Sequence, residues 1–298
     1  MKAKENTAKL MLIISMAIFG TIGLFVRYIP LSSGEIALYR AILACIMIGA
    51  FLLIRKQKID WHLIKESLPL LAISGIAIGF NWILLFEAYK YTTVSVATLS
   101  YYFAPVIVTV ACPILFKERI TKKQILCSVM STIGVFLITG IGDLSGNDKH
   151  LIGIAFGLGA AILYAAVIIL NKYIKNVGGT VRTFLQFIAA VIVLIPYVLL
   201  TSGINVSALN TGALIAMLTV GIVHTGITYC MYFSSLGELS GQKAAILSYI
   251  DPLVAVIVSV TILREAMSLW QIIGGILILG FTLLNEINPH SEENIKGE

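Results

Sequence analysis

Apolar runs of about 20 residues recur along almost the whole chain, and this recurrence limits its possible folds more than any other feature. A helix of about 20 residues crosses the hydrocarbon core of a bilayer. The composition agrees, since 58% of the residues are hydrophobic and only 12% are charged, whereas soluble domains are about 25% charged. The sequence therefore predicts a polytopic integral membrane protein.

We expect an all-α protein, because transmembrane strands alternate in character over about 10 residues and these runs do not. No small-residue cleavage site follows the first run, so we interpret it as a retained helix and not as a signal peptide. The ten predicted transmembrane helices cover residues 10–29, 36–54, 68–90, 94–115, 122–141, 152–173, 183–200, 212–235, 243–263 and 269–284.

Most of the 21 basic residues fall in the segments that lie on the inner side if the N-terminus is inside. Because this bias sets the orientation of membrane proteins, we expect both termini in the cytoplasm and the protein in the plasma or inner membrane. The formal net charge of +6 is thus a topology signal. With no soluble domain to carry a basic patch, nucleic acid is not an expected partner.

The sequence overlays itself after a shift of 147 residues. Pro105 then falls on Pro252, and 13 residues after each proline comes a glutamate, Glu118 or Glu265. Three residues further on, each half has an S/T-x-x-Q capping box that opens a helix. The fixed spacing of these three features indicates an internal repeat.

Each half, residues 1–147 and 148–298, holds five predicted spans. Because five is odd, the second half must enter the membrane upside down relative to the first. The predicted fold class is therefore ten transmembrane helices arranged as two inverted five-helix repeats. Such repeats are a recurring architecture of secondary transporters, which bind substrate near the midplane between the repeats.

The chain resembles the drug/metabolite transporter superfamily, in its ten-helix EamA branch. Two pairings carry the likeness, Pro105 with Glu118 and Pro252 with Glu265, together with Arg40 near the start of the second span. The resemblance implies a central cavity and the export or uptake of small metabolites such as amino acids. There are two departures. In the second half Gln186 aligns with Arg40, because the early helices match at a slightly smaller shift, and the first span has no acidic residue.

Asp251 precedes Pro252 inside an apolar run. A charged side chain at the bilayer centre costs about 2.5–3.5 kcal/mol on insertion scales, and proline removes a backbone donor. We expect Pro105 and Pro252 to break their helices beside the cavity and to act as hinges. Asp251 either contacts a substrate ammonium or couples transport to protons; alternatively, it bonds to backbone freed by Pro252 or packs as a neutral acid between helices.

Four other residues have two interpretations each. Arg40 contacts a substrate carboxylate, or it pairs with Glu35 or reaches the interface. His224 relays protons and contacts substrate, or it is a hydrogen-bonded packing residue. Glu118 and Glu265 brace the turn into the next helix, or they close a gate against a basic residue.

Polar and aromatic side chains form the remaining candidate substrate contacts, because aromatic walls with a few polar groups suit small amphipathic ligands. Packing in a helix bundle is the alternative for each of them. The set consists of Asn81, Trp82, Tyr101, Tyr102, Tyr229 and Tyr249, with Tyr164 as a further candidate for the lining.

We predict a secondary transporter of small organic metabolites, with amino acids or similar amphipathic solutes as the first candidates. We expect that it is not an enzyme and needs no cofactor or metal. It works in the lipid bilayer as a monomer or homodimer, and coupling to protons is left open. The alternatives are a multidrug or toxic-metabolite exporter, an intramembrane enzyme and a non-transporting sensor. For an aspartyl protease the G-x-G-D string ending at Asp143 is the only signal, and no zinc-protease, serine-hydrolase or P-loop motif occurs.

Overall fold

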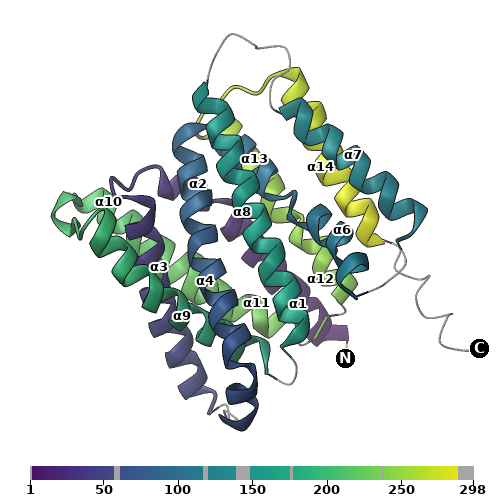
Figure 1. Ribbon diagram of the computed structural model, residues 1–298. Helices are drawn as coiled ribbons and strands as arrows, with labels where there is room; N and C mark the ends of the chain where they lie inside the picture. Colours follow the sequence, from purple (N-terminus) through teal and green to yellow (C-terminus); the bar gives the residue numbers. More distant parts are fainter. Residues whose placement is uncertain are drawn as a thin grey trace, which may run out of the picture.

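The computed structural model describes residues 2–56, 61–116, 120–138, 148–174, 177–236, 238–239 and 241–287. Throughout these ranges the chain is helical and has no strand, as the sequence predicts. Figure 1 shows a single bundle in which α7 and α14 form a pair along one side and α3 and α9 lie toward the other. The helices of the first half are α1 (Lys2–Gly20), α2 (Ile22–Val26), α3 (Ser33–Ile54), α4 (Trp61–Tyr91), α5 (Val94–Tyr101), α6 (Ala104–Phe116) and α7 (Lys122–Ile138).

The second half begins with two long helices and continues with shorter pieces. A 3₁₀ turn, η1, precedes α10, and a π-helical segment, η2, links α10 to α11. The elements are α8 (Asp148–Tyr173), α9 (Gly179–Thr201), η1 (Val206–Ala208), α10 (Thr211–Leu218), η2 (Thr219–Ile227), α11 (Thr228–Leu236), α12 (Gly241–Ser248), α13 (Ile250–Thr261) and α14 (Leu269–Ile287).

Seven helices within the described ranges are long and apolar enough to cross a membrane. The sequence predicted ten spans; the remaining three correspond to shorter helices, α7, α12–α13 and α14. The seven are Lys4–Val26, Ser33–Ile54, Ile64–Tyr91, Val94–Cys112, Asp148–Tyr173, Gly179–Thr201 and Thr211–Leu236.

Helices from the two halves pack against each other. α4 contacts α8 and α9, α3 contacts α9 and η2, and α1 contacts α11 and α13. Glycine permits the closest approach between α4 and α9, because a Cβ on Gly75 would collide with the carbonyl oxygen of Gln186. The main hydrophobic core lies among these interleaved helices.

Both predicted capping boxes are confirmed. Thr121 and Gln124 open α7, with the Thr121 amide donating to Gln124 Oε1 at 2.8 Å and the Gln124 amide donating to Thr121 Oγ1 at 3.2 Å. Ser268 and Gln271 open α14 with the same pair of bonds, at 2.9 and 3.2 Å. These bonds satisfy amide donors that have no partner inside the helix.

The two predicted proline breaks are also found. The span at residues 94–115 divides at Tyr102–Phe103 into α5 and α6, and the span at residues 243–263 divides at Tyr249 into α12 and α13. Pro105 and Pro252 lie in the first turns of α6 and α13. A first helical turn accommodates proline well, because its amide would have no intrahelical acceptor there.

Two other spans differ from the single straight helices that the sequence predicted. The first span is interrupted at Thr21, where Gly20 lies directly against the Asp251 backbone and a Cβ there would approach the Asp251 carbonyl oxygen to 2.5 Å. The eighth span is π-helical in its middle third. Gly221 of that segment faces Leu43 of α3 with no room for a Cβ.

Candidate functional site

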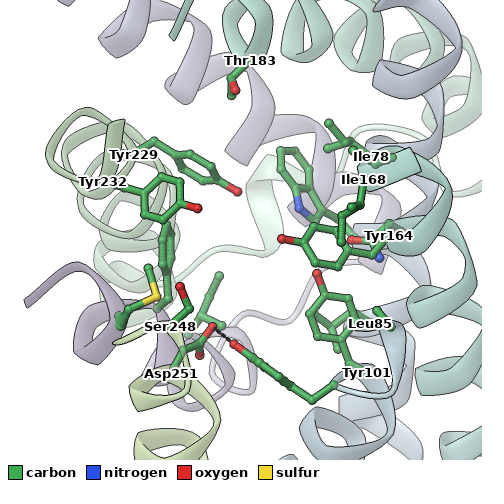
Figure 2. A pocket seen from close by; sticks show the side chains of 18 of the residues that line it. Ile78, Leu85, Tyr101, Tyr164, Ile168, Thr183, Tyr229, Tyr232, Ser248 and Asp251 are labelled. Carbon is green, nitrogen blue, oxygen red and sulfur yellow. Dashed lines mark hydrogen bonds between the residues drawn. The ribbon is translucent and has the colours of Figure 1, made fainter. Parts of the chain in front are cut away.

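A cavity of about 530 Å³ is enclosed by helices from both halves of the chain (Figure 2). This volume falls within the range of about 300–1,000 Å³ that is typical of small-molecule sites. Eight of the nine predicted substrate contacts line it, and so does Pro105. The eight are Arg40, Asn81, Trp82, Tyr101, Tyr102, Tyr229, Tyr249 and Asp251.

Asp251 lies in the first turn of α13, directly after the break at Tyr249. Its Oδ2 accepts a hydrogen bond of 2.6 Å from the hydroxyl of Tyr102, which lies at the break between α5 and α6. Within the described ranges it forms no ion pair. The two helix breaks therefore meet through one hydrogen bond, and the carboxylate faces the cavity without a cationic partner.

Arg40 is buried in the second span, with 4% of its surface exposed. Its Nε donates to Thr225 Oγ1 at 2.7 Å, and its guanidinium lies 4.3 Å from the centre of the Trp82 ring. The alternative pairing with Glu35 is wrong, because Glu35 instead closes the capping box with Ser32 and accepts from the Asn205 amide. The interfacial alternative is also wrong, since the side chain is buried.

The π-helical segment η2 positions the partner of Arg40. Thr225 Oγ1 donates to the carbonyl oxygen of Val220, five residues earlier, at 2.9 Å and accepts from Arg40. The wider turn of a π-helix directs such side chains differently from an α-helix, and π-helical turns are frequent at functional sites.

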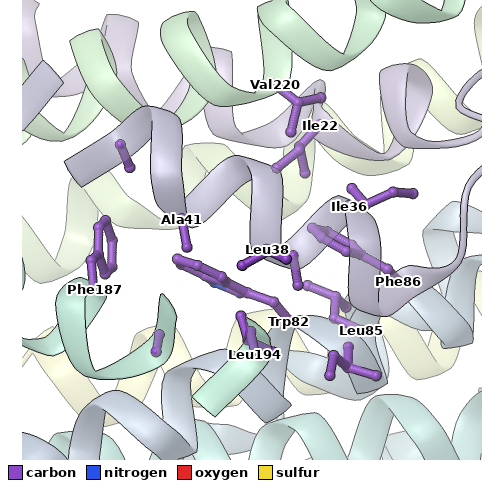
Figure 3. Close-up of a cluster of buried hydrophobic side chains, with 14 of the residues drawn as sticks. Ile22, Ile36, Leu38, Ala41, Trp82, Leu85, Phe86, Phe187, Leu194 and Val220 are labelled. Atoms are coloured by element: carbon purple, nitrogen blue, oxygen red, sulfur yellow. The ribbon is translucent and has the colours of Figure 1, made fainter. Parts of the chain in front are cut away.

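One wall of the cavity is continuous with the hydrophobic core. Trp82 stacks under the Arg40 guanidinium and packs edge-on against Phe187, with ring centres 5.0 Å apart. Figure 3 shows both rings beside Ala41 and Leu194, in the layer between α3, α4 and α9. Because these neighbours are closely packed, the rings form a rigid apolar wall.

Tyrosine hydroxyls face one another across the cavity. In Figure 2, Tyr229 and Tyr232 lie on one side and Tyr101 and Tyr164 on the other, with their hydroxyl ends directed into the space between them. The Tyr101 and Tyr164 rings are in contact, with centres 5.3 Å apart. The cavity thus combines apolar ring faces with hydroxyl donors and acceptors.

Asn81 and Gln186 link helices at the edge of the cavity. Asn81 Nδ2 donates to the Ala160 carbonyl of α8 at 2.6 Å. Gln186, which the predicted repeat aligns with Arg40, donates to Ser74 Oγ at 2.7 Å and to Asn171 Oδ1 at 2.8 Å. Both amide side chains are therefore engaged in bonds between helices.

His224 lies away from the cavity wall, although the sequence made it a candidate for substrate contact. It is 2% exposed, its Nε2 pairs with Thr21 Oγ1 at 2.9 Å and its ring meets Phe25 edge-on. Its Nδ1 lies 3.2 Å from the Thr219 carbonyl oxygen. These contacts match the alternative of a hydrogen-bonded packing residue.

Glu265 also lies outside the cavity, at one end of the bundle. Its Oε1 forms an ion pair of 2.7 Å with Arg27 Nη2, and its Oε2 accepts from the Val94 amide at 2.8 Å and from the Ser259 hydroxyl. It therefore connects α2, α5 and α13. Glu118 and Asp143 lie outside the described residues, and Pro252 is buried beside the cavity without lining it.

Several lining residues were not predicted. Arg182 of α9 lines the cavity and was not among the predicted contacts, because basic residues near the span ends served only to orient the chain. Tyr89 and Tyr232 also line the cavity and were not predicted. Thr225, which bonds to Arg40 without lining the cavity, gave no signal because a π-helical turn has no distinct sequence period. Among the described residues there is no group of three or more His, Cys, Asp or Glu side chains that could hold a metal ion.

Comparison with known proteins places the chain among membrane transporters. The model of the EamA-like transporter family matches residues 6–140 and 151–286. An uncharacterized transporter, YxxF, of Bacillus subtilis is 30% identical over 297 residues, which cover 99% of this chain and 94% of the relative. Protein PecM of Dickeya dadantii is 24% identical over 217 residues, 72% of each chain.

A solved crystal structure shares the fold, with a TM-score of 0.64 and 16% identity over 92% of this chain and 95% of the other. The apolar helices and the transporter relatives together make this a multi-pass membrane protein. Because the family model matches most of the sequence in two consecutive segments, the chain belongs to the EamA-like transporter family, within the drug/metabolite transporter superfamily.

Proposed function

We propose that this transporter moves small organic metabolites that carry both an amino and a carboxylate group, amino acids first, by alternating access to the central cavity. The observation that carries the proposal is that Asp251 and Arg40 line one cavity and that neither forms an ion pair within the described ranges. Uncompensated charges away from bulk water are costly. A zwitterionic substrate would neutralise both.

The proposed scaffold has ten spans in two inverted halves, with both termini in the cytoplasm. The breaks before Pro105 and Pro252 support it, because irregular backbone at membrane depth is tolerated where it lines a cavity. In this scheme the α5–α6 and α12–α13 breaks are the hinges about which the halves rock.

The cavity reaches toward the helix ends at Asn171, Arg182 and Leu236. At the other end of the bundle, Arg27 and Glu265 join α2 to α13. We assign the first end to the cytoplasm, from the positive-inside bias, so that the structure represents an inward-facing state.

Efflux from proteoliposomes preloaded with a mixed metabolite pool tests this function. Mass spectrometry would record which compounds leave, with and without an imposed pH gradient, against protein-free liposomes. We expect amino acids to leave faster than from the protein-free control, and acceleration by the gradient would show proton coupling. Efflux of cationic drugs alone would favour the multidrug alternative, and no efflux from folded protein would favour a sensor or an enzyme.

A further inference from the structure

The fixed charges of the cavity do not balance. Among the described residues that line it, two arginines, Arg40 and Arg182, face a single carboxylate, Asp251. All the other lining side chains are neutral at pH 7. The wall therefore carries an excess of one positive charge.

Arg182 is built into this wall and is not free at the surface. It lies one turn into α9, it is half-buried, and its Nε is buried without a hydrogen-bond partner. Its Nη1 makes only a long bond of 3.4 Å to the Asn171 carbonyl oxygen. No ion pair within the described ranges includes it, so this cation has no anionic partner among the described residues.

Neighbouring polar groups are already engaged. The amide nitrogen of Gln186, one turn further along α9, is bonded to Ser74 and Asn171. The position near the start of α9 adds to the preference for an anion, because the N-terminus of a helix carries a partial positive charge.

Asp251 and Thr183, the residue after Arg182 on α9, lie toward opposite ends of the cavity in Figure 2, with the level of Tyr229 and Tyr232 between them. A substrate whose amino group contacts Asp251 therefore leaves Arg182 available for a different group.

We propose that the preferred substrates are amino acids with a net negative charge, and that Arg182 selects the second anionic group, on the side chain. This inference rests on the proposed function and names the substrate class of the same site. The zwitterionic part neutralises Asp251 and Arg40, and the side-chain anion neutralises Arg182. Electrostatic complementarity of this kind gives specificity and also discriminates against cations.

Counterflow into proteoliposomes with isosteric pairs tests the charge requirement. L-glutamate and L-glutamine have nearly the same shape and differ by one charge, as do L-aspartate and L-asparagine, and 2-aminoadipate extends the series. We expect uptake of the acidic member to exceed that of its amide by at least about tenfold, the effect of one charge-assisted hydrogen bond. The length of the acidic side chain that is taken up fastest would indicate how far Arg182 reaches into the cavity.

Three variants assign the effect to Arg182. Arg182→Gln should reduce the acidic-to-amide rate ratio about tenfold, and Arg182→Lys should restore much of it. Arg55→Gln is the matched control, because Arg55 is an exposed arginine outside the cavity that rests on Phe51. A ratio is used because a loss of folded protein lowers both rates together.

Equal uptake of glutamate and glutamine by the wild type, or a ratio that Arg182→Gln leaves unchanged, would overturn the proposal and make Arg182 a topology charge only. Uptake of amides alone would overturn it and leave the proposed amino acid transport intact. Uptake of no amino acid at all would overturn both.

Discussion

The two broken helices, α5–α6 and α12–α13, share a backbone design and differ in chemistry. Each breaks just before a proline, at Tyr102–Phe103 and at Tyr249. At the position before the proline, the first has Ala104, which is 1% exposed, and the second has Asp251. The feature that both helices share opens each of them beside the cavity, and the acid that only the second has gives the described lining its single carboxylate.

The two breaks also touch, through the hydrogen bond from Tyr102 to Asp251. The α5–α6 break, which has no acid, thus supplies a hydrogen-bond donor to Asp251 at the α12–α13 break. In the proposed function the backbone breaks serve the movement of the helices and Asp251 serves recognition or coupling, and each of these roles can be disturbed separately.

Asp251→Asn should have the largest effect. The amide can still accept a bond from Tyr102, but it carries no charge for a substrate ammonium or a proton. We expect initial transport rates to fall about 100-fold, with an unchanged gel-filtration profile. Wild-type rates in this variant would assign Asp251 a structural role.

Arg40→Lys should have the next largest effect. Lysine keeps the charge but loses the planar stack on Trp82 and the geometry of the bond to Thr225, so it is not a conservative change here. We expect about a tenfold rise in the substrate concentration that gives half-maximal transport. A change in stability with no change in that concentration would mean that Arg40 only joins helices.

Tyr102→Phe removes the bond between the two breaks and leaves the ring. We expect transport to fall about fivefold, the effect of a bond worth about 1 kcal/mol. Combined with Asp251→Ala it should add little, because alanine has already removed the acceptor of this bond. Additive losses in the double variant would contradict the coupling of the two breaks.

Pro105→Ala and Pro252→Ala test the shared backbone feature. Each should slow the maximal rate by about threefold through a change in helix flexibility, while the half-saturating concentration stays constant. Concentration series of initial rates separate the two parameters. A shift in half-saturation alone would place these prolines in binding and not in movement.

Glu265→Gln should change transport least and stability most. It weakens the ion pair with Arg27 and the bonds to Val94 and Ser259, which we expect to cost about 2 kcal/mol of unfolding free energy. Thermal unfolding in detergent measures this loss. An unchanged melting temperature together with altered substrate preference would favour the gate over the brace.

Much of the helical framework follows from the sequence. The apolar runs predicted most helix positions. The S/T-x-x-Q strings predicted the starts of α7 and α14, and the prolines predicted both breaks. These are local signals, since a cap or a proline acts on its own turn.

The rest depends on tertiary contacts. The first span is interrupted at Thr21, where Gly20 packs closely against the backbone of Asp251. The two residues are more than 200 positions apart in sequence. The orientation of Arg40 needs Thr225, whose direction is set by the π-helical η2. His224 was predicted to contact substrate and does not, whereas Arg182 was not predicted and lines the cavity. Residue type alone does not indicate which face of a helix meets the cavity.

The central claim is that one cavity opens alternately to the two sides of the membrane, and side-specific labelling tests it most directly. Ser248, the last residue of α12, lines the cavity directly before the break at Tyr249. It would be replaced by cysteine after removal of the native Cys45, Cys112, Cys127 and Cys230. A membrane-impermeant maleimide would then be added to either side of oriented vesicles. The account predicts labelling from both sides, with substrate changing the two rates in opposite directions, whereas labelling from one side only, with and without substrate, would contradict it.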